Sequence, residues 1–412
     1  MAEIVVRYHA VTPAGLTAFS YQAFEENIMS ARDAETPAKS RKPRWPVLAA
    51  AVLLSHLAFN ADAETVRVEV VNKQLDHPWG LTFIDKGRML VTEKAGTMRL
   101  IQADGSLGAP LAGLPKVDPG GQGGLLDVLA DSGFARNRLI YFCFSEPAGN
   151  GAGNSTALAV ARLSDDDLRL ENLKVLFSQK PKFASSHHFG CRIVESADGK
   201  LFLTLGDRFR RMQDAQTLNN HHGKVVRINK DGTAPADNPF AGKAGALPEI
   251  WSVGHRNSQG ATTGPDGRLW IHEHGPQGGD EINRPEAGKN YGWPVITYGE
   301  NYGGGPVGAG LTEKPGMEQP LHHWTPSIAP SGMAFLRSDR YGRAWQGSLF
   351  VGSLKFQYLD RLEIRDNRVV KEEKLLQDLK QKIRDVREGP DGLLYVLTDA
   401  SPGQLLRLLP GP

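Results

Sequence analysis

Two adjacent imidazoles stand where an alternating apolar segment begins, in the stretch SSHHFGCRI that contains His187 and His188. Successive side chains of a strand point to opposite faces, so at most one of the two can face a shared site. An imidazole is suited to general base catalysis near neutral pH, and a hydrogen-bonded loop histidine is an equally weighted alternative. A zinc site has little support, because His272 and His274 form HEH rather than HExxH.

A second polar stretch, HEHGPQGGDEIN, could supply oxygen ligands to a hard cation. Its Gly275-Pro276 pair cannot form a central ladder, which leaves the two backbone carbonyls free for a ligand. Asp280 and Glu281 place carboxylates nearby. A plain turn with a solvated acidic tip explains the same residues equally well, so this stretch alone leaves the two interpretations open.

Basic side chains recur in segments that are far apart in the chain. Arg256 lies in WSVGHRNSQG, and Lys355 ends GSLK. Lys382 and Arg384 lie on one side of the strand that is expected in QKIRDVREGPDG. If these four converge, they form a pocket for an anionic ligand, preferably a carboxylate, which arginine binds through two parallel hydrogen bonds. Each one taken singly is more commonly a surface charge.

The elements that must position these groups are short strands that follow turn dipeptides. Six copies of a turn and an alternating hydrophobic strand recur at a spacing of roughly 45 to 80 residues, which is typical of propeller blades with loops of variable length. The copies begin at Asp85, Ala135, Ala197, Pro265, Trp345 and Pro390. The sequence therefore predicts an all-β fold, a six-bladed β-propeller of four-stranded antiparallel blades.

The segment TVRVEVV, at residues 65–71, is predicted to pair with the last blade and close the ring, which removes an open sheet edge. The glycine-rich stretch from Tyr298 to Gly310 contains a formal GxGxxG pattern. It is not a dinucleotide fingerprint, because Pro306 lies inside it and no strand precedes it. We expect this stretch to form a flap over a pocket.

The amino-acid composition excludes several classes of protein. The chain of 412 residues carries 48 Lys+Arg against 46 Asp+Glu, so it lacks the excess positive charge of a nucleic-acid-binding protein, and no nucleic-acid partner is expected. Its 40% hydrophobic residues exclude disorder as the dominant state. Two cysteines, Cys143 and Cys191, are too few for a disulfide-rich scaffold.

The N-terminal region carries the pattern of a secretory signal peptide. A basic stretch at residues 39–44 precedes an apolar run at residues 47–59 and an Ala-x-Ala site, with cleavage expected after Ala63. The apolar run is too short to span a bilayer, so no stable membrane insertion is expected. A buried N-terminal helix is the alternative, which the prolines and the cationic flank make less favourable.

The same pattern sets the expected domains and compartment. Residues 1–63 form a leader with the signal peptide, and residues 64–412 form a single catalytic propeller domain. Met29 would give a leader of more usual length, so the true start codon is expected there. The mature protein is predicted to be periplasmic or secreted, an oxidising location in which the two cysteines could pair.

Several stretches together resemble the soluble pyrroloquinoline quinone (PQQ)-dependent sugar dehydrogenases, and most of all their aldose sugar dehydrogenase branch. These stretches are HPWGLTF, DPGGQGGLLDV, HHFGCRI, GKVVRINKDG, PEIWSVGHRNSQG, HEHGPQGGDEINRPEAGKNYGWP, APSGMAF and IRDVREGPDGLLYVLTD. The resemblance implies a propeller that holds PQQ and Ca²⁺ near its axis. It implies an aldose as substrate, oxidised at C1 to the lactone, an external electron acceptor, and a monomer or homodimer.

The resemblance also implies roles for single residues. His188 matches the base that takes the anomeric hydroxyl proton while hydride passes to the quinone, and Arg256 matches the cation beside the quinone oxygens. Gln122 matches a glutamine near the sugar and the base. The residues that match cofactor ligands are Arg256, Asn257, Gln259, Lys355, Lys382 and Arg384. The residues that match calcium ligands are Gly275 and Pro276 at the catalytic ion, through their carbonyls, and Glu281 with the backbone of Tyr291 at a second, structural ion.

The sequence departs from the glucose-type pattern at several positions. His187 replaces an acidic residue and Arg208 replaces a glutamine, and we expect both changes to touch the sugar subsite and alter the glucose-type specificity. Lys382 stands where members of the family generally carry arginine. Lysine keeps the positive charge but cannot form the two parallel hydrogen bonds that arginine forms with a carboxylate. For Cys191 we favour a packed small residue, with a disulfide to Cys143 as the alternative.

Two other function classes compete with the dehydrogenase. A propeller lactonase that uses a central Ca²⁺ would line the axis with carboxylates and asparagine, whereas this chain offers carbonyls and cations. A non-catalytic extracellular propeller that serves as a binding module is the second alternative, since the fold alone does not determine function. The combination of His188, Arg256, Lys355 and Arg384 favours the dehydrogenase, because a binding module does not need them together.

Overall fold

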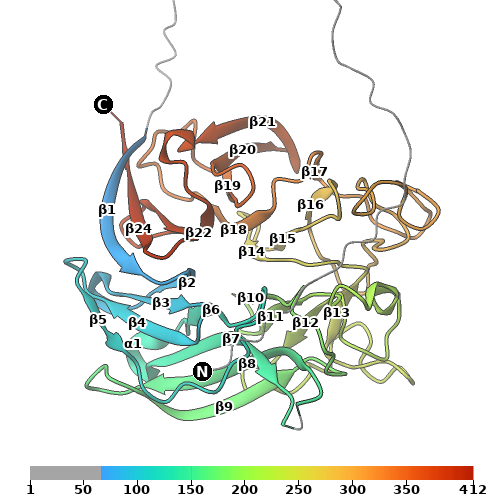
Figure 1. Cartoon of the computed structure of the whole chain (residues 1–412), viewed down its shortest axis with the longest axis horizontal. Helices are drawn as coiled ribbons and strands as arrows, with labels where there is room; N and C mark the ends of the chain where they lie inside the picture. The colour runs from blue at the N-terminus through green and yellow to red at the C-terminus, as the bar shows by residue number, and fades with distance from the viewer. Residues whose placement is uncertain (1–65, 150, 412) are drawn as a thin grey trace, which may run out of the picture. The chain divides into compact units, whose positions relative to one another are not determined.

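The computed structural model describes residues 66–149 and 151–411, which form six four-stranded antiparallel sheets (Figure 1). We number these blades along the chain. Blade 1 contains β2 (Pro78–Phe83), β3 (Met89–Glu93), β4 (Thr97–Ile101) and β5 (Leu107–Pro110). Blade 2 contains β6 (Leu125–Ala130), β7 (Leu139–Pro147), β8 (Asn154–Leu163) and β9 (Leu170–Ser178). Blade 3 contains β10 (Gly190–Glu195), β11 (Leu201–Leu205), β12 (Lys224–Ile228) and β13 (Ile250–Val253).

The second half of the chain continues the same pattern. Blade 4 contains β14 (Gly260–Thr263), β15 (Leu269–Glu273), β16 (Asp280–Asn283) and β17 (His322–Trp324). Blade 5 contains β18 (Pro330–Phe335), β19 (Leu349–Ser353), β20 (Leu359–Arg365) and β21 (Arg368–Leu375). Blade 6 contains β22 (Ile383–Glu388), β23 (Leu394–Thr398), β24 (Gly403–Pro410) and β1 (Val66–Leu75). The predicted six-bladed, all-β fold is confirmed.

Helical segments in the described part of the chain are short. They are η1 (Asp85–Gly87), α1 (Phe134–Asn137), η2 (Met212–Gln216) and η3 (Gln377–Leu379). Among the described residues, no helix has the length and apolar character needed to cross a membrane. The predicted signal peptide and the expected start at Met29 lie outside the described residues.

The turn dipeptides act as the sequence predicts. Gly199, Gly267 and Gly392 adopt left-handed φ angles of 74°, 75° and 75° in the turns before β11, β15 and β23, a conformation that favours glycine. The second strand of each blade is buried on both faces, because it lies between two neighbouring blades. In β7, for example, Phe142 belongs to the core shared with blade 1 and Tyr141 to the core shared with blade 3.

The ring closes between the two ends of the domain (Figure 1). β1 pairs antiparallel with β24, with Val68 opposite Leu408 and Val70 opposite Leu406. The innermost strand of each blade packs against the innermost strands of the two neighbouring blades. The predicted closure is thus confirmed, and it begins at Val66, within one residue of the expected segment.

The meander order of the strands brings two sets of loops to one end of the propeller. One set leads from the fourth strand of a blade to the innermost strand of the next, and the other joins second and third strands. His188 and Arg256 lie in loops of the first set, and Gly275 and Lys355 lie in loops of the second. Residues from four different loops can therefore meet at this end.

Buried ion pairs join the innermost strands of three blades below these loops. Arg192 of β10 donates to Asp127 of β6 at 2.9 Å and lies 2.9 Å from Asp385 of β22. Arg387 binds the same two carboxylates, at 2.7 and 3.0 Å. Arg387 therefore belongs to this buried cluster, whereas Arg384 on the same strand pairs with Asp399. Each buried charge is neutralised, which is the condition for keeping such groups inside a protein.

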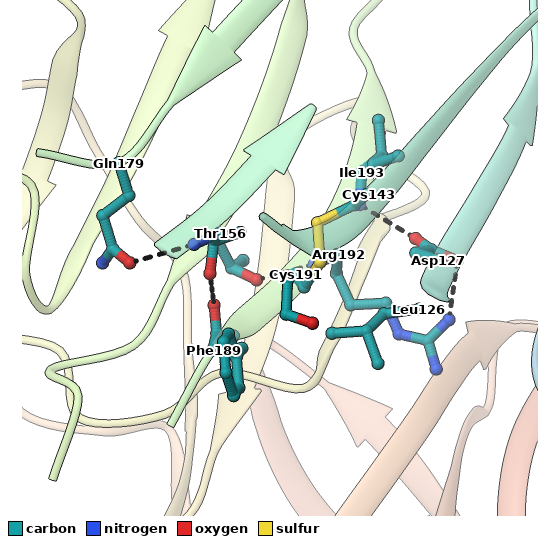
Figure 2. Close-up of a disulfide and its surroundings, with 12 residues drawn as sticks. Leu126, Asp127, Cys143, Thr156, Gln179, Phe189, Cys191, Arg192 and Ile193 are labelled. Atoms are coloured by element: carbon teal, nitrogen blue, oxygen red, sulfur yellow. Dashed lines mark hydrogen bonds and ion pairs between the residues drawn. A yellow bond between two sulfur atoms is a disulfide. The ribbon is translucent and has the colours of Figure 1, made fainter. Parts of the chain in front are cut away.

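Cys143 and Cys191 form a disulfide, so the favoured expectation of a packed small residue at Cys191 was wrong (Figure 2). Cys143 on β7 and Cys191 on β10 have Cα atoms 5.8 Å apart, within the range that a disulfide bridges. Sequence could not decide between the two states, because it does not show which face of β7 packs against β10 in the next blade. The bond ties blade 2 to the strand that follows His188.

Candidate active site

His188 lies at the centre of the candidate site. Its imidazole Nδ1 is 2.6 Å from an oxygen of Asp207, and both side chains are almost fully buried. The main chain of His188 is left-handed, with φ 53°, and its N–H donates to the side-chain oxygen of Gln122 at 2.8 Å. Because Nδ1 is held by Asp207, Nε2 is the ring nitrogen that remains to meet a substrate.

Asp207 was missed in the sequence because the pair Gly-Asp after an apolar strand looks like an ordinary turn. Its second oxygen accepts the indole N–H of Trp293 at 2.7 Å, and the first also accepts the N–H of Phe209 at 2.7 Å. A buried carboxylate with three fixed donors cannot rotate freely, so it holds the imidazole in one orientation and one tautomer. The pattern LGD shortly after HH is the signal that could have identified it.

The two groups shift each other's pKa. Burial lowers the pKa of His188 below its ordinary value, Asp207 opposes this shift, and the charge of Arg256 adds to it. Burial by itself would raise the pKa of Asp207, but the charge and hydrogen bond of His188 and the charge of Arg256 lower it below its ordinary value. The imidazole is therefore neutral at neutral pH and can accept a proton.

Gln122 and Asn257 connect His188 to the loops that precede blades 2 and 4. The Gln122 side-chain oxygen accepts from the Asn257 amide at 3.4 Å as well as from His188. The Asn257 oxygen accepts the N–H of Gly190 at 3.1 Å, and its side chain is fully buried. The structure thus brings these two predicted residues to His188, where Asn257 has a structural role that the sequence did not indicate.

Arg256 is buried and points toward the predicted calcium ligands. Its Nη1 donates to the carbonyls of His274 and Gly275 at 3.0 and 2.6 Å, and its Nη2 donates to the Tyr302 hydroxyl at 3.3 Å. Its main-chain N–H donates to Glu273 at 2.6 Å. The Nε atom is buried without a hydrogen-bond partner, so its N–H can still donate to a ligand.

A cavity of about 460 Å³ lies beside Arg256 and contains the predicted calcium ligands. Gly275, Pro276 and Lys355 line it, together with Tyr298 and Tyr302 of the glycine-rich stretch. This stretch therefore lies over a pocket, as predicted. A carbonyl oxygen has two lone pairs, so the Gly275 oxygen can accept from Arg256 and still bind a hard cation. The backbone carbonyl oxygens of Gly275 and Pro276 are ligands of the type that Ca²⁺ prefers.

The remaining cations lie on blade 6. Arg384 donates to the Gln259 side chain at 3.1 Å and to Asp399 at 2.7 Å, and its Nε is buried without a partner. Lys382 is exposed, and its carbonyl accepts the N–H of Asp399. The structure joins Gln259 to Arg384 directly. Among the described residues, Lys355 and Lys382 form no ion pair, which leaves them available to an anionic cofactor.

Glu281 and Tyr291 belong to a separate polar cluster behind Arg256. Burial raises the pKa of Glu281 well above its ordinary value, and the neighbouring Glu273 carboxylate raises it further. The Tyr291 ring stacks on His255 with centroids 5.0 Å apart, and His255 contacts Glu273 at 3.0 Å. The hydroxyl of Tyr291 is held by main-chain groups, so only its backbone is available to a second ion.

Arg208 does not face the sugar subsite, which corrects the expectation from the sequence. Its side chain is fully buried and donates to the carbonyls of Ser185, His187 and His188, at 2.5, 2.6 and 3.2 Å, and to the side chain of Asn154. Burial lowers the pKa of Arg208 to about 9. The guanidinium therefore holds the loop that carries His188 from inside the protein.

A family model described as glucose/sorbosone dehydrogenase matches residues 75–407. This chain belongs to the glucose/sorbosone dehydrogenase family. The resemblance stated from the sequence is confirmed, and His188, Asp207 and Arg256 all lie inside the matched region of this sugar dehydrogenase family member.

Two proteins and one solved structure illustrate the family. The chain is 45% identical to the aldose sugar dehydrogenase of Escherichia coli over 362 residues, which cover 87% of this chain and 96% of the relative. It is 27% identical over 420 residues to quinoprotein glucose dehydrogenase B of Acinetobacter calcoaceticus, covering 83% and 87%. The crystal structure of the soluble aldose sugar dehydrogenase of E. coli in its apo-form superposes with a TM-score of 0.81 at 45% identity, over 84% of this chain and all of that one.

Proposed function

We propose that this family member oxidises aldoses at C1 to lactones, with PQQ as the hydride acceptor and Ca²⁺ as its partner ion. The observation that carries the proposal is the pairing of His188 with Asp207 next to the buried Arg256. Arg256 donates to the carbonyls of His274 and Gly275, and both of these residues line a cavity that Lys355 also lines. An E. coli relative named aldose sugar dehydrogenase supports the substrate class.

The residues fit a tricarboxylic quinone in chemistry. Four positive groups on three blades are available to such a ligand. Arg256 and Arg384 each have a buried guanidinium nitrogen without a partner, and Lys355 and Lys382 are exposed. Each can form a charge-assisted hydrogen bond with a carboxylate or a quinone oxygen. The name quinoprotein carried by the A. calcoaceticus relative supports the same cofactor class. When bound, PQQ supplies the two-electron acceptor that no side chain can provide.

The side chains at the site then have separate roles in the reaction. Nε2 of His188 takes the proton of the C1 hydroxyl, and Asp207 stabilises the imidazolium that forms. Arg256 would stabilise negative charge on a quinone oxygen. Its guanidinium is fixed before the reaction by the hydrogen bonds to the carbonyls of His274 and Gly275. Gln122 accepts the main-chain N–H of His188 and so helps to fix the position of the imidazole.

The structure argues against the lactonase alternative. A central Ca²⁺ held by side chains would need free carboxylates near the axis, but Asp127 and Asp385 are both bound by arginines. Within residues 66–149 and 151–411, no group of three His, Cys, Asp or Glu side chains is placed to hold a metal. A carbonyl-based ion site beside a cofactor agrees better with these residues.

Export to the periplasm or the medium is part of the proposal. The disulfide between Cys143 and Cys191 supports it, since such bonds persist in oxidising compartments. The cleavage site after Ala63, the exclusion of residues 1–63 from the mature domain, and an external electron acceptor belong to the same proposal. N-terminal sequencing of the mature protein would test the cleavage site.

Dye-linked oxidation of an aldose panel tests the function. The purified protein is assayed alone, with Ca²⁺, with PQQ, and with both. We expect turnover only with both additions, and lactone as the product. If the folded protein oxidises no aldose under any of these conditions, the proposal is wrong and a binding role becomes the better explanation.

A further inference from the structure

Two large aromatic side chains are exposed beside the proposed catalytic groups. Phe209 is 42% exposed and Tyr302 is 62% exposed. Most other aromatic rings of the described chain are packed in the cores between blades. A solvent-facing aromatic pair at the mouth of a site is a common mark of a surface that a ligand covers.

The two rings span the space between the base and the guanidinium. The Phe209 ring lies 5.3 Å from the His188 ring, centroid to centroid, at 85°. It lies 6.4 Å from the Tyr302 ring. Tyr302 accepts a hydrogen bond from Arg256 at 3.3 Å through its hydroxyl. A molecule that reaches Nε2 of His188 from this side must therefore pass along the two rings.

The position of Phe209 is built into the backbone. Arg208 and Phe209 have consecutive left-handed φ angles of 59° and 66°, a conformation that is costly for residues other than glycine and that clusters at functional sites. The N–H of Phe209 donates to Asp207 at 2.7 Å, on the same oxygen that contacts His188. This arrangement turns Arg208 inward to the base loop and Phe209 outward to the mouth.

We propose that Phe209, with Tyr302 opposite it, is a specificity-determining residue that packs against the C–H face of the aldose ring. The inference rests on the proposed aldose oxidation and adds the surface that orients the sugar. A pyranose presents polar edges and an apolar C–H face, and such a face packs on an aromatic ring with its hydroxyls directed away. Packing on Phe209 leaves the C1 hydroxyl at the edge of the ring nearest His188.

Steady-state kinetics of Phe209→Ala, Phe209→Trp and Tyr302→Ala test the proposal. Leu168→Ala is the matched control, because Leu168 is 61% exposed in the β8–β9 turn, outside the candidate site. Each variant is assayed with aldose varied at fixed dye, with dye varied at fixed aldose, and in a PQQ titration. Circular dichroism and the unfolding midpoint verify that each variant is folded.

The expected result is a rise in the KM for aldoses of about two- to tenfold in Phe209→Ala, the size of one aromatic contact. Tyr302→Ala should raise the same KM, Phe209→Trp should keep it near the value of the unmodified protein, and Leu168→Ala should not change it. The KM for the dye and the PQQ needed for half-maximal activity should stay constant in both Phe209 variants and in Leu168→Ala, none of which removes a residue that lines the cofactor cavity.

An unchanged aldose KM in Phe209→Ala would overturn the inference. A rise confined to the KM of the dye would also overturn it, because the rings would then contact the electron acceptor. A rise in the PQQ requirement would assign them to the cofactor. Failure of the unmodified protein to oxidise any aldose with PQQ and Ca²⁺ would overturn the proposed function itself, and this outcome is distinguishable because it does not depend on Phe209.

Discussion

At the scale of single residues, burial and a paired carboxylate act in opposite directions on the His188 imidazole. Burial removes the water that would stabilise the imidazolium, and the Asp207 carboxylate partly replaces it. The net effect lowers the pKa of His188, so the ring is unprotonated before the substrate arrives. In the proposed reaction, Asp207 then stabilises the positive charge that forms on the imidazole.

Removal of the base should separate catalysis from cofactor binding. His188→Ala should lower turnover of aldoses by about two to four decades, the usual contribution of a general base, while the PQQ titration stays unchanged. His187→Ala is the matched control, because it removes the neighbouring exposed imidazole, and its turnover should fall far less. Full activity of the His188 variant would remove this residue from the mechanism.

The acid limb of the pH profile reports the pKa of His188. The lowered pKa predicts that kcat/KM holds its plateau below pH 6.5 and falls as the pH drops through the lowered value. Asp207→Asn removes the charge that raises this pKa, so the acid limb should move to still lower pH while kcat falls. A shift of the limb to higher pH in Asp207→Asn would contradict the pairing.

Residue types singled out His188 and the cations as candidates, but they did not indicate the side chains that hold His188 in place. His188, Arg256 and Lys355 were identified by chemistry and resemblance. Asp207 and Trp293 were not, because a Gly-Asp turn and a tryptophan in a loop have many ordinary explanations. Their roles depend on contacts across 19 and 86 residues of sequence, and periodicity carries no information at such separations.

At the scale of elements, one buried arginine organises the loop that carries the base. Three carbonyls of residues 185–188 accept from Arg208, and its guanidinium lies 3.7 Å from the centre of the Phe189 ring. These contacts hold a loop whose left-handed residue at His188 is costly by itself. The short repeats predicted the strands on each side, but Arg208 was expected at the sugar subsite, because its contacts with residues 185–188 cannot be read from the sequence.

Loosening this loop should affect chemistry more than substrate affinity. Arg208→Lys keeps the charge and loses the fork, so we expect kcat to fall by about one to two decades, as for a misplaced catalytic group. Arg210→Ala is the control, since Arg210 is exposed two residues further along. A drop in aldose affinity with unchanged kcat in Arg208→Lys would place Arg208 in the sugar subsite after all.

At the scale of the whole molecule, blades are joined by cores, ion pairs and one covalent bond. The Arg192 and Arg387 pairs connect blades 2, 3 and 6 below the candidate site. The disulfide connects blade 2 to the strand that begins two residues after His188. The number of blades was predictable from six repeats. The ties between blades were not, because they depend on the register between sheets.

The disulfide should contribute measurably to stability. Cys143→Ser with Cys191→Ser should lower the free energy of unfolding by about 2–4 kcal/mol, because the bond restricts the unfolded chain. Urea unfolding followed by circular dichroism measures this loss. A reductant applied during unfolding should lower the midpoint of the unmodified protein and leave that of the double variant unchanged. Equal midpoints for the unmodified protein with and without reductant would show that the bond does not stabilise the fold.

The most direct test of the account is a titration of the PQQ- and Ca²⁺-loaded protein with an aldose in the absence of any electron acceptor. We predict one lactone formed per bound PQQ, with the quinone absorbance replaced by that of its reduced form, and this conversion slowed by at least about two decades in His188→Ala. An aldose that leaves the quinone spectrum unchanged, or lactone formed without reduction of the quinone, would contradict it.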